Sequence, residues 1–287
     1  MGLQSMKPML KAAREGGYGV AAFNIVDYNS ARAVVLAAGE LRAPIIVQVS
    51  VKTVRFWGPA AIAAWMRELC ADSPVPISLH LDHCKDIHVI RDCIAAGWTD
   101  VMIDASHKPF EENLALTREV VGLASYAGAG VEAELGQIGG VEEEKRVEDA
   151  DAHLADPDKA ALFCRDLPLA AFAPAIGTAH GLYKGEPRIA FDRLEAIARR
   201  TGLPIALHGG TGLSDDVFRK CIALGCAKVN ISTQLKHTFI DSFVEYHAAH
   251  CEYEPLKPLG AQFERMKQEV MEKITLFGSC GRAAACA

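Results

Sequence analysis

The sequence predicts an α/β protein folded as a (β/α)8 TIM barrel in a single domain. Short apolar runs rich in β-favouring residues recur eight times along the chain. Amphipathic stretches with the period of a helix separate these runs. The 287 residues give about 36 residues per repeat (287/8), which is near the spacing that a barrel of this kind uses.

The predicted strands read as nearly continuous apolar runs, as expected of parallel strands that are buried on both faces. They cover Val20–Asn24, Ile45–Ser50, Ile77–Asp82, Asp100–Asp104, Gly130–Leu135, Ala170–Ile176, Pro204–His208 and Ala227–Ile231. The predicted helices cover Ser30–Leu41, Pro59–Cys70, Asp86–Ala96, Phe110–Ala127, Pro157–Arg165, Ile189–Thr201 and Asp215–Leu224.

Two regions depart from this alternation. Ile138–Ala155 is rich in glycine and acidic residues, which is typical of a solvated loop, although a long loop after a barrel strand can also act as an active-site lid. The C-terminal part, 233–287, reads as mainly helical through Glu264–Phe277. We expect it to pack outside the barrel or across a subunit interface.

Composition excludes several classes of function. Half of the residues are hydrophobic and the net charge is −6, so non-specific binding to nucleic acid is not expected, whereas an anionic small-molecule substrate remains possible. No apolar run approaches bilayer length, and no apolar signal segment follows Met1–Pro8. The nine cysteines form no CxxC pair, which is typical of a reduced, cytoplasmic protein.

Three histidines fall at the ends of predicted strands. His83 and His180 follow the third and sixth strands, His208 ends the seventh, and Asp82 and Glu134 lie near such ends as well. A single histidine in this position is usually structural, but the carboxyl ends of barrel strands converge on one site. Imidazoles from separate strands are a common way to hold a catalytic zinc ion that keeps an open position. By contrast, we expect His80, inside the third strand, to pack in the core.

The segment Gly209–Gly212 predicts an anion site, because it lies between the seventh strand and the next helix. Glycines let backbone N–H groups approach an anion, and phosphates in these barrels often bind after strands seven and eight. The expected additional donors are Asn230, Ser232 and Thr233 from the eighth strand, together with Gly181 and Lys184.

Taken together, the motifs resemble those of the class II, metal-dependent fructose-bisphosphate and tagatose-bisphosphate aldolases, in order and over nearly the whole chain. The matching segments are Ala22–Asn24, His80–His83, Val101–Asp104, Val131–Gly140, Ala175–Gly181, His208–Gly212, Lys228–Asn230 and Leu276–Ser279.

This resemblance implies a role for each matching residue. His83, His180 and His208 are the implied metal ligands, with Glu134 near or on the metal. Asp82 is the implied acid/base at the C4 hydroxyl, and Glu142 is the implied carboxylate that exchanges the proton at C3. The implied substrate and phosphate contacts are Asn24, Ser50, Gly181, Gly209, Gly210, Thr211, Asn230, Ser232 and Thr233. Within the site, Val141 stands in place of an acid, Thr211 in place of Ser, and Ser232 in place of Asp or Ala. Leu167–Leu169 and Pro174, near the sixth strand, are also unusual for the family and should affect packing more than chemistry.

The activity implied by the resemblance is reversible cleavage of fructose 1,6-bisphosphate to dihydroxyacetone phosphate and glyceraldehyde 3-phosphate, through an enediolate stabilised by zinc. Tagatose 1,6-bisphosphate and phosphorylated sugar acids are alternative substrates. The resemblance also implies a homodimer or homotetramer and a monovalent cation near the phosphate. Cobalt or iron could replace zinc on the same ligands.

Three other functional interpretations explain parts of the sequence. Lys228, near the eighth strand, could form a Schiff base without any metal, but this mechanism leaves the three histidines unexplained. A barrel that binds metal and phosphosugar without turnover would explain the histidines and not the carboxylates. Metal-dependent hydrolysis would use the same ligands and differ in its products.

Overall fold

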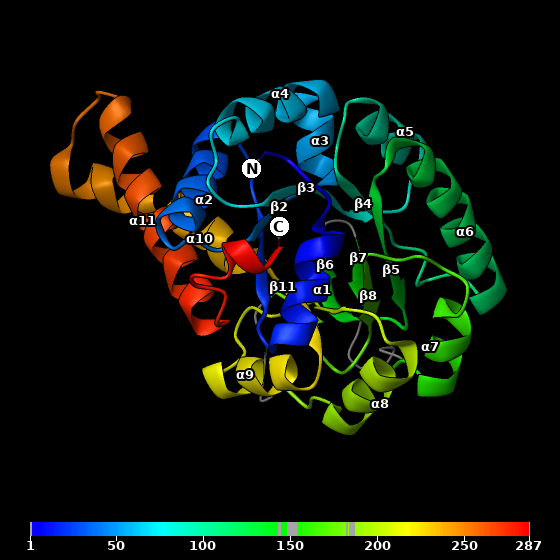
Figure 1. Cartoon of the computed structure of the whole chain (residues 1–287). Helices are drawn as coiled ribbons and strands as arrows, with labels where there is room; N and C mark the ends of the chain where they lie inside the picture. The colour runs from blue at the N-terminus through cyan, green and yellow to red at the C-terminus, as the bar shows by residue number, and fades with distance from the viewer. Residues whose placement is uncertain (1, 143–144, 148–153, 182, 184–186, 287) are drawn as a thin grey trace.

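Eight parallel strands form a closed barrel in the computed structural model, which describes residues 2–142, 145–147, 154–181, 183 and 187–286 (Figure 1). The strand order around the barrel is β1-β11-β10-β8-β5-β4-β3-β2. Every predicted strand is confirmed, with ends that differ by at most two residues. The strands are β1 (Val20–Asn24), β2 (Ile45–Ser50), β3 (Ile77–Cys84), β4 (Asp100–Ile103), β5 (Gly130–Leu135), β8 (Ala171–Pro174), β10 (Ile205–Leu207) and β11 (Cys226–Ile231).

The helices that surround the barrel also follow the prediction. They are α2 (Tyr28–Glu40), α4 (Pro59–Cys70), α5 (Ile87–Ala95), α6 (Phe110–Ala127), α7 (Pro157–Cys164), α8 (Phe191–Thr201) and α9 (Asp215–Ala223). Asp156 caps α7 as expected, because its side chain accepts the backbone N–H groups of Asp158 and Lys159.

Two further helices were not predicted. One is α3 (Val51–Trp57), which begins where the predicted second strand ends, because the Ser50 side chain accepts the Thr53 N–H and caps the helix. The other, α1 (Met6–Gly16), precedes the first strand and is capped by Ser5.

The prediction of a loop for Ile138–Ala155 is wrong in part. β6 (Gly139–Glu142) and β7 (Lys145–Val147) pair as an antiparallel hairpin, and β6 also pairs in parallel with β9 (Ala179–His180). The register places Gly140 opposite His180. Local composition could not show this pairing, because β9 supplies the partner edge from a distant part of the chain.

The N-terminal end of the barrel is closed by α1, which lies across it (Figure 1). Met6, Met9 and Leu10 of α1 are fully buried. They pack against small and branched side chains from five strands, namely Ala22, Ile46, Ala171, Ala206 and Ala227. This end is therefore filled with side chains, which leaves the carboxyl ends of the strands for a site.

The C-terminal part is helical, as predicted. It contains α10 (Thr233–His250), α11 (Leu256–Leu276) and a final turn, η2 (Ala283–Cys286). Parts of α10 and α11 extend away from the barrel, whereas η2 lies beside α1 (Figure 1). Within the described residues, no helix is long and apolar enough to cross a membrane.

Candidate active site

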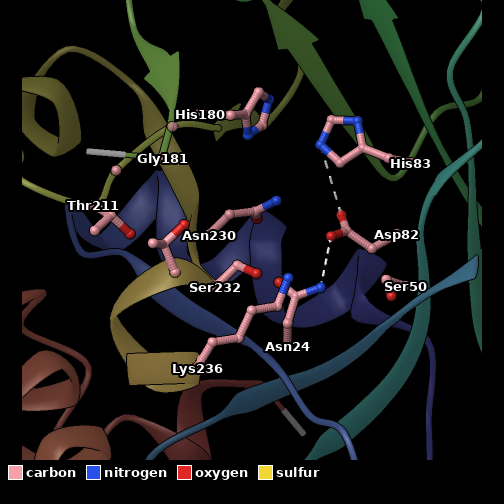
Figure 2. A pocket seen from close by; sticks show the side chains of 13 residues that line it. Asn24, Ser50, Asp82, His83, His180, Gly181, Thr211, Asn230, Ser232 and Lys236 are labelled. Atoms are coloured by element: carbon pink, nitrogen blue, oxygen red, sulfur yellow. Dashed lines mark hydrogen bonds and ion pairs between the residues drawn. The ribbon is translucent and has the colours of Figure 1, made fainter. Parts of the chain in front are cut away.

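The three predicted histidines converge at the carboxyl end of the barrel. His83 lies near the end of β3, His180 ends β9, and His208 directly follows β10. One ring nitrogen from each lies within 4.8 Å of the others. Nδ1 of His208 and Nε2 of His83 are 2.6 Å apart. Figure 2 shows His83 and His180 facing the pocket, whereas His208 is buried, with 1% of its surface exposed, and is not among the lining residues.

The backbone adopts positive φ angles at two positions where these histidine segments meet. His83 has φ 45°, a left-handed conformation that is unusual for a residue with a side chain, at a point where the β3–β4 register shifts. Gly209, directly after His208, has φ 66°. A Cβ atom on Gly209 would lie 2.6 Å from the carbonyl oxygen of Ala179, the neighbour of His180. Only glycine lets the two histidine segments approach this closely.

Tyr183, which the sequence did not single out, joins the same two segments. Its hydroxyl donates to the carbonyl of Gly209 at 2.7 Å and accepts the N–H of Ala179 at 3.0 Å. Tyr183 lies outside the helices and strands, so no periodic pattern in the sequence marked it as a site residue.

Two buried carboxylates lie beside the histidines. Oε2 of Glu134 is 3.7 Å from Nδ1 of His83 and 4.0 Å from Nδ1 of His208. Oδ2 of Asp104 is 3.6 Å from Nδ1 of His83. The sequence predicted Glu134 but not Asp104, although Asp104 directly follows β4 and the strand-end criterion could have found it.

Asp82 is held in place by a pair of buried amides. Nδ2 of Asn24 donates to Oδ2 of Asp82 at 2.8 Å, and Nε2 of Gln48 donates to Oδ1 of Asn24 at 2.7 Å. Gln48 was not predicted as a site residue. Burial alone would raise the pKa of Asp82, but the neighbouring His83 and Lys228 outweigh it, so the pKa is lowered. Asp82 is therefore ionised at neutral pH.

The predicted substrate residues gather around one pocket (Figure 2). Its lining includes Asn24, Ser50, Asp82, His83, His180, Gly181, Gly209, Gly210, Thr211, Asn230, Ser232 and Thr233. It also includes Lys236, which was missed because an exposed lysine on a helix usually faces solvent. In Figure 2 the Lys236 side chain extends between Ser232 and Asn24.

Two predicted site residues cannot be placed fully. Lys184 lies outside the described residues. Glu142 ends β6, but its side chain lies outside the described part of the chain. The pairing of Gly140 with His180 brings the backbone of this acidic segment to the histidines.

Lys228 does not line the pocket. Its side chain is fully buried, and its Nζ forms an ion pair with Oε2 of Glu132 at 2.8 Å. His80 is also fully buried, as predicted, with Nε2 3.6 Å from the same oxygen.

The donor set suits a divalent transition metal. Burial, and then the neighbouring His83 ring, lower the pKa of His208, so that its ring is neutral and able to bind a metal. Three imidazoles with an adjacent carboxylate are typical zinc donors, and cobalt or iron accept the same atoms. The residues therefore fit a catalytic cation.

Comparison with known proteins identifies the family. Residues 4–282 match the model of the family described as fructose-bisphosphate aldolase class-II. The chain is 40% identical to the "probable fructose-bisphosphate aldolase" of Bacillus subtilis, over 99% of this chain and 100% of that protein. It is 37% identical to the "sulfofructosephosphate aldolase" of Alkalicoccus urumqiensis, over 97% of this chain and 98% of that protein.

A solved structure agrees in fold. The crystal structure of the YdjI aldolase from Escherichia coli K12 superposes with a TM-score of 0.87 at 30% identity, covering 98% of this chain and 99% of that one. The chain therefore belongs to the class II fructose-bisphosphate aldolase family, and it is an aldolase, a lyase.

Proposed function

We propose that the protein cleaves fructose 1,6-bisphosphate reversibly to dihydroxyacetone phosphate and glyceraldehyde 3-phosphate, with a zinc ion held by His83, His180 and His208. The observation that carries this proposal is the meeting of three ring nitrogens within 4.8 Å at the edge of a pocket that also contains a carboxylate base. When bound, the cation would act as a Lewis acid on the oxygens of the substrate. We assign Glu134, whose Oε2 lies 3.7 Å from Nδ1 of His83, to complete or adjust the ligand set.

In this proposal Asp82 moves the proton at the C4 hydroxyl of the ketose. It is ionised, it lines the pocket, and it is oriented by Asn24 and Gln48. Removing this proton lets the C3–C4 bond break and releases an aldehyde. General acid–base help of this kind typically contributes about 10²- to 10⁴-fold.

We assign the proton transfer at C3 to Glu142. The support for this assignment is the pairing of β6 with β9, which ties the acidic segment to His180. Once the aldehyde has formed, Glu142 would protonate C3 of the remaining three-carbon fragment to give dihydroxyacetone phosphate.

The remaining pocket residues are proposed to bind phosphate. Backbone N–H groups around Gly209–Thr211 and the hydroxyls of Ser232 and Thr233 surround the space after β10 and β11. Lys236 adds a positive charge next to these hydroxyls, and Ser50 and Asn24 also line the pocket. Binding the non-reacting ends positions the reacting carbons. A monovalent cation near this phosphate is part of the proposal.

The buried state of Lys228 argues against a Schiff-base mechanism. A lysine nucleophile must reach the substrate carbonyl, and Lys228 is fully buried in an ion pair. Borohydride treatment with substrate should leave no covalent adduct on Lys228.

Product analysis distinguishes the proposed aldolase from a hydrolase and from a barrel that binds without turnover. Only the aldolase releases both dihydroxyacetone phosphate and an aldehyde.

A second substrate has support from the comparisons. The Alkalicoccus urumqiensis relative is named for a sulfofructose phosphate, whose anionic sulfonate could occupy the place of one phosphate. Steady-state kinetics on the fructose and tagatose bisphosphates and on sulfofructose phosphate would test the choice. Our proposal predicts the highest kcat/KM for fructose 1,6-bisphosphate, and a preference for either rival would replace the substrate without changing the mechanism.

We further propose a homodimer or homotetramer that functions in the cytoplasm in carbohydrate metabolism such as glycolysis. Ile240, Val244 and Leu256 expose 58%, 62% and 74% of their surface on α10 and α11, and in our proposal a subunit interface would cover these apolar side chains. The nine cysteines are free, which suits a reducing compartment. Light scattering of the purified protein would test the assembly.

A further inference from the structure

Glu132 links a metal-ligand candidate to a lysine that the proposed reaction does not use. It lies on β5 two residues before Glu134, so both side chains point to the same face of the strand. Glu132 is completely buried, and so is its partner Lys228 on β11. Their ion pair, at 2.8 Å between Nζ and Oε2, crosses the interior of the barrel.

The second oxygen of Glu132 contacts His208. Oε1 of Glu132 lies 2.7 Å from Nε2 of the histidine. An ionised carboxylate only accepts hydrogen bonds, so Nε2 must carry the proton. The lone pair of this ring then resides on Nδ1, the atom that faces Nε2 of His83 at 2.6 Å.

We propose that Glu132, held by Lys228, is a positioning residue that fixes the tautomer and orientation of His208 and thereby strengthens metal binding. This inference rests on the proposed metal-dependent function. Carboxylates that accept the second N–H of a ligating histidine orient the ring and raise its basicity.

Stability alone is a weak reason for this pair. Removing two charges from water is costly, and buried ion pairs can often be replaced by apolar residues of similar volume without loss of stability. A pair retained only for structure would have no reason to place one carboxylate oxygen against a metal-ligand candidate. The proposal also gives Lys228 a role: it holds the carboxylate that orients His208.

The test compares variants that separate positioning from packing. Glu132→Gln removes the charge but leaves Lys228 unmatched and could fail to fold, so the double variant Glu132→Met/Lys228→Met is made as well, because it restores neutrality and removes the oxygen that accepts the Nε2–H of His208. His80→Gln is the matched control, since His80 approaches the oxygen of Glu132 that pairs with Lys228 and not the oxygen that meets His208. Circular dichroism and thermal unfolding establish that each variant is folded.

The readouts are Zn²⁺ affinity, by competition with a chromophoric chelator, and the ¹⁵N shifts of the His208 ring. We expect the folded double variant to bind Zn²⁺ about 10- to 100-fold more weakly than wild type, with ring shifts of mixed neutral tautomers. We expect His80→Gln to keep wild-type affinity. A double variant with wild-type affinity and a single tautomer would overturn the inference, as would an equal loss in His80→Gln. If the wild-type protein bound no Zn²⁺, that result would instead contradict the proposed function, and the inference that rests on it.

Discussion

The two ends of the barrel bury carboxylates in opposite electrostatic surroundings. At the N-terminal end, Asp100 accepts hydrogen bonds from the hydroxyls of Ser5 and Ser78 and from the N–H of Met6. Burial raises its pKa to about 6, and these hydrogen bonds only partly offset the effect. At the C-terminal end burial would raise the pKa of Glu132 too, but Lys228 and His208 outweigh it and hold the pKa well below the usual range.

This difference shows that burial alone does not decide the charge of a carboxylate. Neutral donors at Asp100 serve to attach the start of α1 to the first residue of β4. Cationic and imidazole partners at the other end keep Asp82 and Glu132 ionised, as proton transfer and ligand orientation require. One end of the barrel therefore serves closure, and the other carries the proposed chemistry.

The largest expected effect of the difference between the two ends of the barrel is on kcat, when Asp82 is substituted. Asp82→Asn removes the proposed base without changing its size, so kcat should fall by about 10²- to 10⁴-fold, while the bound metal is retained. Steady-state kinetics with metal analysis measures both quantities.

Asp100→Asn is the matched control for Asp82→Asn, because it alters a buried carboxylate at the closed end. Its kcat should equal that of wild type. Equal losses of kcat in the two variants would contradict the division between the two ends.

A pH series sharpens the comparison further. The folded-state pKa of Asp100, about 6, exceeds the ordinary value of 3.8, so the native state binds more protons between these values. The stability that Asp100 contributes is full below pH 3.8 and falls, by up to about 3 kcal/mol, as pH rises through 6. Urea unfolding should therefore show wild type losing stability relative to Asp100→Asn over this range. A difference that does not change with pH would refute the shift.

The smallest predicted effect concerns Lys236. Lys236 is exposed, so solvent screens its attraction for a substrate phosphate and limits it to about 1 kcal/mol. Lys236→Met should therefore raise KM only about five- to tenfold, with little change in kcat. Lys257→Met, which removes an exposed ion pair with Glu252 away from the pocket, is the control and should leave KM unchanged. If both variants had the same KM as wild type, Lys236 would have no part in substrate binding.

Sequence periodicity was sufficient for the barrel because each buried strand is a local apolar run. The convergence of His83 and His208 followed from the same reasoning, since parallel strands end at one edge. His180 proved different in detail, because it lies on the separate strand β9 and pairs with β6. That pairing joins distant segments and has no local signature.

The contacts of the Glu132–Lys228 pair could not be predicted from the sequence. Alternation along β5 places Glu132 on the same face as Glu134, which the sequence reveals. Its contacts with Lys228 and His208 depend on the side-chain arrangement inside the closed barrel, to which distant strands contribute. No local pattern carries that information.

Metal removal and reconstitution test the central claim most directly. Purified protein should contain about one divalent ion per chain, as one three-histidine site implies. Dialysis against a chelator should abolish cleavage of fructose 1,6-bisphosphate, and Zn²⁺ or Co²⁺ should restore it, while His180→Asn should bind the ion weakly and stay inactive. Full activity in metal-free protein, or borohydride-trapped substrate on Lys228, would contradict the account.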